Sequence, residues 1–161
     1  MNLNRIIPLI LFTTGSVMAA ETVEHTVTVT AQIPTDSFYV MPVGDWIGST
    51  QKLQFNPNTR KLEALYRQME VKSTIGPVKG YLLYKPSLSK ANGDEIGLKV
   101  KFADKELTTV SQQLLTLADV QNAKKVGFEI IPDKEPEAGY KAGNYQGQIS
   151  MVFESEAPVS Q

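Results

Sequence analysis

The sequence predicts an all-β domain of the β-sandwich class, and three observations support this. Residues Val23–Ile33 alternate between apolar and polar side chains, apart from His25 on the apolar face, and this is the period of a half-buried strand. Further short alternating runs follow, separated by turn signals at intervals of roughly ten residues. The segment Ser111–Lys124 has some helical character, but its leucines and alanines fit a single stripe poorly, so a short helix or a turn is expected there.

Residues 1–19 are predicted to be a cleavable secretory signal. Arg5 supplies a positive charge, Ile6–Phe12 is apolar apart from one proline, and small residues follow. This apolar run is too short to cross a bilayer. Cleavage is expected after Ala19, with Ala20 as the alternative, and a buried N-terminal helix is the competing interpretation. We expect an N-terminal extension over 20–34 and one globular domain over 35–161.

Composition excludes several classes of protein. The formal charge of the 161 residues is −1, and it becomes −2 when Arg5 is removed with the signal. A net charge this close to zero creates no positive electrostatic potential that would attract nucleic acid, so no nucleic-acid partner is expected. The chain contains no cysteine, so a secreted domain of this size must be stable through packing and hydrogen bonds alone.

The first predicted strand has an unusual position, at the extreme N-terminus of the processed chain. One face carries the side chains of Val23, Val27, Val29, Ala31 and Ile33. Pro34 follows directly, and a proline at this point favours a break between strand and domain. A strand so placed can leave its own domain and pair with another chain.

Four strands are expected in the first half of the domain: Ser37–Val43, Lys52–Phe55, Gln68–Ile75 and Val78–Tyr84. The second of them ends at a strong turn signal, Asn56-Pro57-Asn58. Gly76-Pro77 separates the last two, which suggests a hairpin, although the proline argues against a tight primed turn.

Three strands are expected in the second half: Ile96–Phe102, Val126–Ile131 and Tyr145–Glu154. In the last, alternate positions place one set of side chains on a common face: Tyr145, Gly147, Ile149, Met151 and Phe153. The polar tail after Glu154 is expected to end outside the sheet.

Nothing in the sequence predicts catalysis, a metal or a cofactor. The one histidine, His25, lies in the N-terminal strand; we interpret it as solvated, with a contact at the edge of a subunit interface as the alternative. Acid pairs such as Asp94-Glu95 stand among turn residues without the spacing of a catalytic pair or a calcium loop. Trp46, between two glycines, is interpreted as a core or interface residue, with sugar stacking as the alternative.

Both ends of the processed chain resemble a known family. The start, Val23–Pro34, is similar to the start of major pilins of the colonisation factor antigen I type, which alternate Thr and Val and then reach Ala and Pro. The segment Ala142–Phe153 resembles the family's closing strand, Ala-Gly-x-Tyr-x-Gly followed by alternating aliphatic residues. The two ends together are more specific than either alone.

The resemblance implies an immunoglobulin-like β-sandwich that lacks its final strand, completed by a donor strand from a neighbouring subunit. It implies a fimbrial shaft subunit of the chaperone–usher pathway, exported through the periplasm to the cell surface. Its partners would be identical subunits, a periplasmic chaperone, an outer-membrane usher and a tip adhesin.

The resemblance also implies residue roles. The donor face would be Val27, Val29, Ala31 and Ile33, with Val23 at the mouth of the acceptor groove. Pro34 would be the hinge, and the strand Tyr145–Phe153 would border the groove. The junction Ile33-Pro34 lacks the acidic residue often found there in the family. A minor pilin or adhesin, and a monomeric periplasmic binding module, are the alternative functions.

Overall fold

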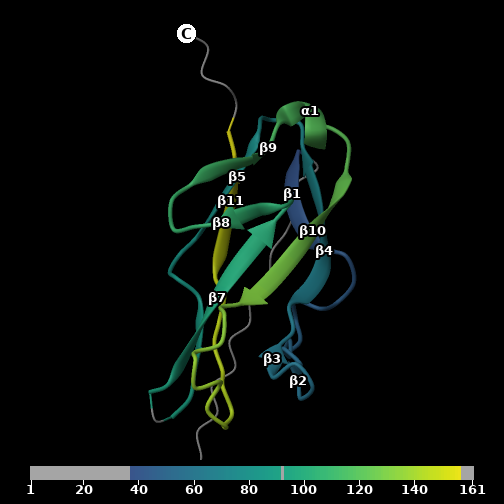
Figure 1. Cartoon of the computed structure of the whole chain (residues 1–161). Helices are drawn as coiled ribbons and strands as arrows, with labels where there is room; N and C mark the ends of the chain where they lie inside the picture. The colour runs from purple at the N-terminus through teal and green to yellow at the C-terminus, as the bar shows by residue number, and fades with distance from the viewer. Residues whose placement is uncertain (1–36, 92, 157–161) are drawn as a thin grey trace, which may run out of the picture. The chain divides into compact units, whose positions relative to one another are not determined.

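The computed structural model describes residues 37–91 and 93–156. The predicted signal sequence, the Val23–Ile33 strand and Pro34 lie outside the described residues. The described part forms the expected all-β sandwich, in which a larger and a smaller sheet pack on a shared core (Figure 1). Within it, no helix has both the length and the apolar character that a membrane span requires.

The larger sheet has the strand order β1-β4-β10-β7-β6, and β8 also pairs with β7. These strands are β1 (Phe38–Pro42), β4 (Leu65–Ser73), β6 (Ser87–Ser89), β7 (Glu95–Phe102), β8 (Lys105–Leu107) and β10 (Lys124–Pro132). The smaller sheet has the order β11-β5-β9 and contains β5 (Val78–Leu82), β9 (Gln112–Leu115) and β11 (Met151–Ser155). The pairings within the described residues are all antiparallel.

Alternation of apolar residues explains why these segments are strands. In β7, the side chains of Ile96, Leu98, Val100 and Phe102 are buried, and those between them are more exposed. Phe102, on the larger sheet, packs against Phe153 of the smaller one with ring centroids 4.6 Å apart. The two sheets are therefore joined by aromatic side chains in the middle of the core.

The expected hairpin between Gln68–Ile75 and Val78–Tyr84 is wrong, although both strands exist. Strand β4 pairs with β1 and β10, whereas β5 pairs with β9 and β11. The chain crosses from one sheet to the other between Ser73 and Val78. Pro77 has no N–H to give to a hairpin ladder, and the buried Ser73 hydroxyl bonds the Gly76 carbonyl at 2.9 Å instead.

The segment Ser111–Lys124 is only partly helical. It begins with strand β9, whose Leu114 and Leu115 are both buried, at a point where the register with β5 shifts. Helix α1 (Leu117–Val120) follows and is a single turn. A capping box begins it, in which the side chains of Thr116 and Asp119 each accept a hydrogen bond from the backbone N–H of the other. The hydrogen bonds from Thr116 lower the pKa of Asp119.

The turn signal at Asn56-Pro57-Asn58 is confirmed. It connects β2 (Phe55–Asn56) to β3 (Lys61–Leu62) in a small two-stranded sheet. The Asn56 side-chain oxygen accepts hydrogen bonds from the backbone N–H groups of Asn58 and Thr59, at 3.0 and 3.2 Å. The strand expected at Lys52–Phe55 is therefore shorter and later, because it spans Phe55–Asn56.

Replacement of Phe102, which is fully buried, tests this core. We expect Phe102→Ala to lower the free energy of unfolding by about 3–5 kcal/mol, because it leaves a cavity between the sheets. Urea denaturation followed by the fluorescence of Trp46, the one tryptophan of the chain, measures the change. The control Tyr66→Ala, at a side chain that is 63% exposed, should change it by less than about 0.5 kcal/mol.

Candidate functional site: the β1–β11 side of the sandwich

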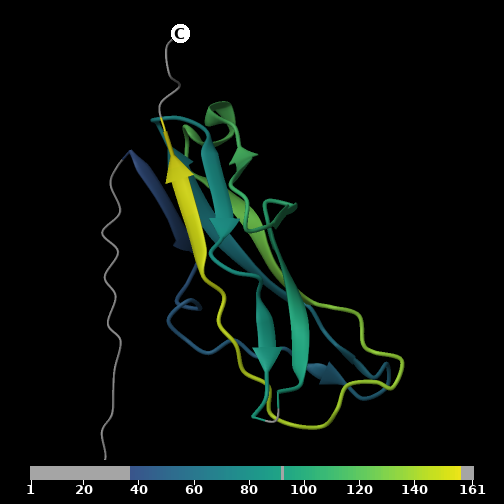
Figure 2. The ribbon, with the colours of Figure 1, turned by 90° about the vertical axis from the view of Figure 1, so that its left-hand side faces the viewer.

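The side of the sandwich where β1 ends the larger sheet and β11 ends the smaller one is the candidate site, and we call it the β1–β11 side. Strand β11 lies beside β5 in the smaller sheet (Figure 2). Phe38 of β1 is in register with Ser73 of β4, and Ser73 in turn contacts Ser155 of β11. The two terminal strands therefore lie on the same side of the core.

The inward side chains of both terminal strands are incompletely covered. On β11 these are Met151, Phe153 and Ser155, all half-buried, although their register partners Leu82, Gly80 and Val78 on β5 are buried. Strand β1 shows this contrast only at its two ends: Phe38 and Pro42 are half-buried beside the buried Ser73 and Met69 of β4, whereas Val40 between them is buried in the core. The apolar interior thus continues to an edge that no described residue covers.

Backbone groups add to this incomplete coverage. Within the described residues, β11 pairs with β5 and with no second strand. A terminal strand of this kind presents a row of N–H and C=O groups that another strand can pair with. The β1–β11 side therefore combines backbone hydrogen-bonding capacity with half-buried apolar side chains, which together can bind an extended segment.

Phe153 occupies the middle of β11 and depends on a glycine opposite it. A Cβ atom added at Gly80 would lie 2.6 Å from Leu114 Cδ1 and 3.0 Å from Phe153 Cδ1. The missing side chain at position 80 therefore lets the Phe153 ring tilt inward onto Phe102. This packing fixes the position of the terminal strand relative to the core.

A hydroxyl cluster fixes the other end of β11. The Ser73 and Ser155 hydroxyl oxygens are 2.7 Å apart, and the Ser155 hydroxyl also lies 3.0 Å from the Gly76 carbonyl oxygen. The backbone N–H groups of Ile75 and Gly76 donate to the Ser73 hydroxyl, both at 3.3 Å. Strand β11 is thereby tied to the crossing between β4 and β5.

The five residues predicted on one face at the C-terminal end are only partly brought together. Met151 and Phe153 lie in β11 and face the core, and Ile149 packs against the core just before the strand. Tyr145 and Gly147 precede the strand, which begins at Met151 rather than Tyr145. The neighbouring Gln146 forms an isolated bridge with Ser89 of β6.

The segment that leads to β11 is fixed to the other edge of the larger sheet. Lys90 and Lys141 both bind Asp94, with N···O distances of 2.9 and 2.7 Å. The Tyr145 hydroxyl donates to the Lys141 carbonyl, and the Lys90 ammonium lies over the Tyr145 ring. The hydrogen bond to Asp94 raises the pKa of Lys90. A side chain at Gly147 would collide with the Ser87 carbonyl oxygen, so this segment needs glycine there.

Trp46 is half-buried and packs against the core, which agrees with the prediction of a core or interface residue. Its ring stacks on the buried Phe128 with centroids 5.3 Å apart, and its indole N–H donates to the Gln68 carbonyl at 3.2 Å.

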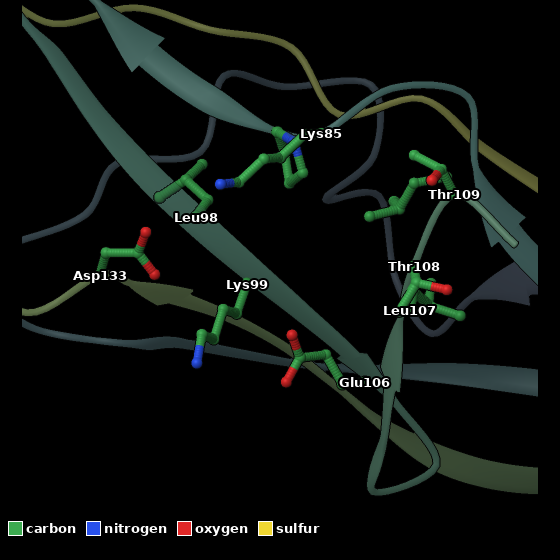
Figure 3. A pocket seen from close by; sticks show the side chains of 10 residues that line it. Lys85, Leu98, Lys99, Glu106, Leu107, Thr108, Thr109 and Asp133 are labelled. Atoms are coloured by element: carbon green, nitrogen blue, oxygen red, sulfur yellow. The ribbon is translucent and has the colours of Figure 1, made fainter.

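A cavity of about 350 Å³ lies elsewhere, between β7, β8 and the ends of β5 and β10. Four charged side chains line it, as Figure 3 shows: Lys85, Lys99, Glu106 and Asp133. No ion pair joins these four side chains within the described part of the chain. Residues 37–91 and 93–156 also hold no group of three His, Cys, Asp or Glu side chains that could bind a metal. The cavity offers no arrangement that indicates catalysis.

Comparison with known families decides the identity. The model of the CS1 type fimbrial major subunit matches residues 23–154, which is most of the chain. The chain belongs to this family. It is a pilin subunit, and this agrees with the resemblance of its two ends to colonisation factor antigen I type pilins. The members of this family are structural subunits. Membership places the protein in a surface fimbrium, in association with other subunits.

A solved structure supports the fold of this pilin. The CooA pilin subunit from enterotoxigenic Escherichia coli is similar with a TM-score of 0.53 and 20% identity, over 71% of this chain and 86% of that one. The match is to the fold, and with the observed sheets it confirms the immunoglobulin-like β-sandwich. No match was found among curated proteins.

The packing of Phe153 over Gly80 gives a test of the pilin's terminal strand. We expect Gly80→Ala to lower the free energy of unfolding by about 1–3 kcal/mol, because the new methyl group overlaps Leu114 and Phe153. Gly127→Ala is the matched control, since a Cβ atom at this strand glycine meets nothing within 4 Å. Equal urea midpoints for the two variants would contradict the proposed role of Gly80.

Proposed function

We propose that this pilin is the major structural subunit of a fimbrial shaft, which polymerises by donor-strand exchange and supports bacterial adhesion. The half-buried inward side chains of β1 and β11, beside fully buried neighbours, carry the proposal. They are what a sandwich lacking its last strand exposes. An added strand would cover them and pair with the backbone of β11.

The donor would be Val23–Ile33 of the neighbouring subunit. Its inward side chains are those of Val23, Val27, Val29, Ala31 and Ile33, and Pro34 would be the hinge to its own domain. Covering roughly 300 Å² of apolar side-chain surface contributes several kcal/mol at about 25 cal/mol per Å². The backbone ladder and slow dissociation supply the rest of the durability that a fibre needs.

The topology favours one direction for the donor. All described pairings are antiparallel, so a strand added to the smaller sheet would run antiparallel to β11. It would then begin beside Ser155 and leave beside Met151. Strand β1 begins at the Ser155 end, because Phe38 is in register with Ser73. The donor strand would leave the groove of one subunit at the Met151 end of that subunit. It would then enter its own domain at the Ser155 end, where β1 begins. Successive subunits would therefore stack head to tail.

Before assembly, the same side needs protection, because an uncovered strand edge with apolar side chains aggregates. A periplasmic chaperone would supply a temporary strand there, and an outer-membrane usher would direct its exchange for the donor strand. A tip adhesin would end the fibre. The subunit itself performs no catalysis in this proposal.

Two substitutions in the donor strand separate its faces. We expect Val29→Asp to abolish polymers, because it places a carboxylate in the apolar interior of the neighbouring subunit. Thr28→Asp, on the outward face of the same strand, should leave polymers intact. Electron microscopy and gel electrophoresis without boiling measure polymer formation. Loss of polymers in both variants, or in neither, would contradict the proposed donor face.

A rearranged chain tests completion of the fold directly. One variant lacks residues 1–34, and a second lacks them but carries Val23–Ile33 on a flexible linker after Glu156. We expect only the second to be a stable monomer, by size-exclusion chromatography and thermal unfolding. If the first is already stable and monomeric, the N-terminal strand is dispensable, and a monomeric binding module becomes the better interpretation.

A further inference from the structure

The hydroxyl cluster at the end of the β1–β11 side has an unused hydrogen-bonding site. Ser73 is the one fully buried polar residue in the described part of the chain. Its hydroxyl already has as neighbours two backbone N–H groups, the Gly76 carbonyl and the Ser155 hydroxyl. A hydroxyl oxygen accepts two hydrogen bonds, so Ser73 has no capacity left for a further donor.

Ser155 differs from Ser73 in this respect. Its proton goes to the Gly76 carbonyl, because the Ser73 oxygen already accepts two N–H groups, and the one hydroxyl that can donate to Ser155 is that of Ser73. Whether or not Ser73 donates to it, at least one of the two acceptor positions on the Ser155 oxygen has no partner among the described residues. Ser155 is half-buried on the inward face of the terminal strand. A donor strand laid over it would exclude water and leave this position unsatisfied, unless the strand brings an N–H or O–H group.

The donor segment contains one residue that meets this need. Positions 23, 25, 27, 29, 31 and 33 share the inward face, and all are apolar except His25. An imidazole carries at least one N–H at any pH at which the protein is folded, so it is always a donor. Charged groups at this end of β11 lie on the other face, where Lys79 and Glu156 form an ion pair at 3.5 Å. The inward neighbours in register are Phe38, Ser73 and Val78.

We propose, resting on the donor-strand function above, that His25 of one subunit donates a hydrogen bond to Ser155 of the next and thereby sets the register of the donor strand. Antiparallel pairing then places Val27 beside Phe153 and Val29 beside Met151. Ala31 would lie beside Ile149, where the chain approaches β11. A slip by two residues puts a valine against the Ser155 hydroxyl and the imidazole among apolar side chains, which costs free energy at both places. His25 is thus a register-determining residue rather than a solvated one.

Cysteine pairs in the full-length chain test the register, because the natural chain contains no cysteine. We expect polymers of Val29→Cys with Met151→Cys, which keep His25 and Ser155, to form disulfides between subunits, which appear as a ladder of covalent multimers on a non-reducing gel. The controls pair Met151→Cys with Val27→Cys or with Ala31→Cys, which represent slips by two residues. A ladder in either control instead of the first pair would overturn the proposed register.

Failure of the register and failure of the proposed function give different results. If Val29→Asp abolishes polymers but the first cysteine pair gives no ladder, the proposed register is wrong and donor-strand exchange still stands. Absence of polymers in the unsubstituted chain would overturn both.

The hydrogen bond itself is tested by substitutions that remove either of its two partners. We expect His25→Val and Ser155→Ala each to shorten the half-life of the polymer in denaturant roughly fivefold. The double variant should dissociate no faster than either single one, because the two changes remove the same interaction. Thr26→Val, the outward neighbour of His25, is the control. An unchanged or longer half-life for His25→Val, or additive effects, would overturn the proposed bond.

Discussion

The uncovered inner faces of β1 and β11 are the constraint on which the rest of this structure depends. A sandwich is stable when each apolar face is covered by another element. Here the inward residues of β5 are buried, as are those of β4 from Met69 to Ser73, whereas those of β11 and of both ends of β1 are only half-buried. The domain therefore has a strong core and one weak side. A family of fibre subunits can use such a side, since the missing cover then comes from another copy.

The crossing between β4 and β5 explains how that side is kept in place. Because Gly76-Pro77 carries the chain from one sheet to the other, Ser73 meets Ser155 across the core rather than along a hairpin. At the middle of β11, Phe153 is held by Gly80 and Phe102. At its start, the preceding segment is bound to β6 through Lys90, Asp94 and Tyr145. In the proposed donor-strand exchange, a terminal strand fixed at three places is preorganised for the donor, which lowers the entropy cost of binding.

The apolar side chains and the hydroxyl group on the terminal strand β11 contribute in different ways to binding another strand. Apolar side chains such as Met151 and Phe153 supply free energy of burial but discriminate poorly between registers, because one valine resembles the next. A buried hydroxyl discriminates well, because it leaves a cost wherever it has no partner. In the proposed register, one polar position among several apolar ones selects a single alignment of the donor strand with β11.

The sequence by itself determined where most strands lie and which family the chain resembles. Alternation is a local property, so Ile96–Phe102 and Val126–Ile131 could be identified without any partner. The inward face of Met151 and Phe153 followed from the same period, whereas the corresponding face of Val23–Ile33 stays a prediction. Trp46 could be assigned to the core because a lone tryptophan between glycines is more often packed than exposed.

Only the tertiary structure decided which strands pair. Strands β4 and β5 are neighbours in sequence but lie in different sheets, since pairing depends on which inner faces pack across the core rather than on separation along the chain. For the same reason, Tyr145 and Gly147 have the alternation of a strand but lie against β6 before β11 begins. The Ser73–Ser155 contact joins residues 82 positions apart. No local sequence pattern predicts such a contact, because it forms only when the two sheets pack together.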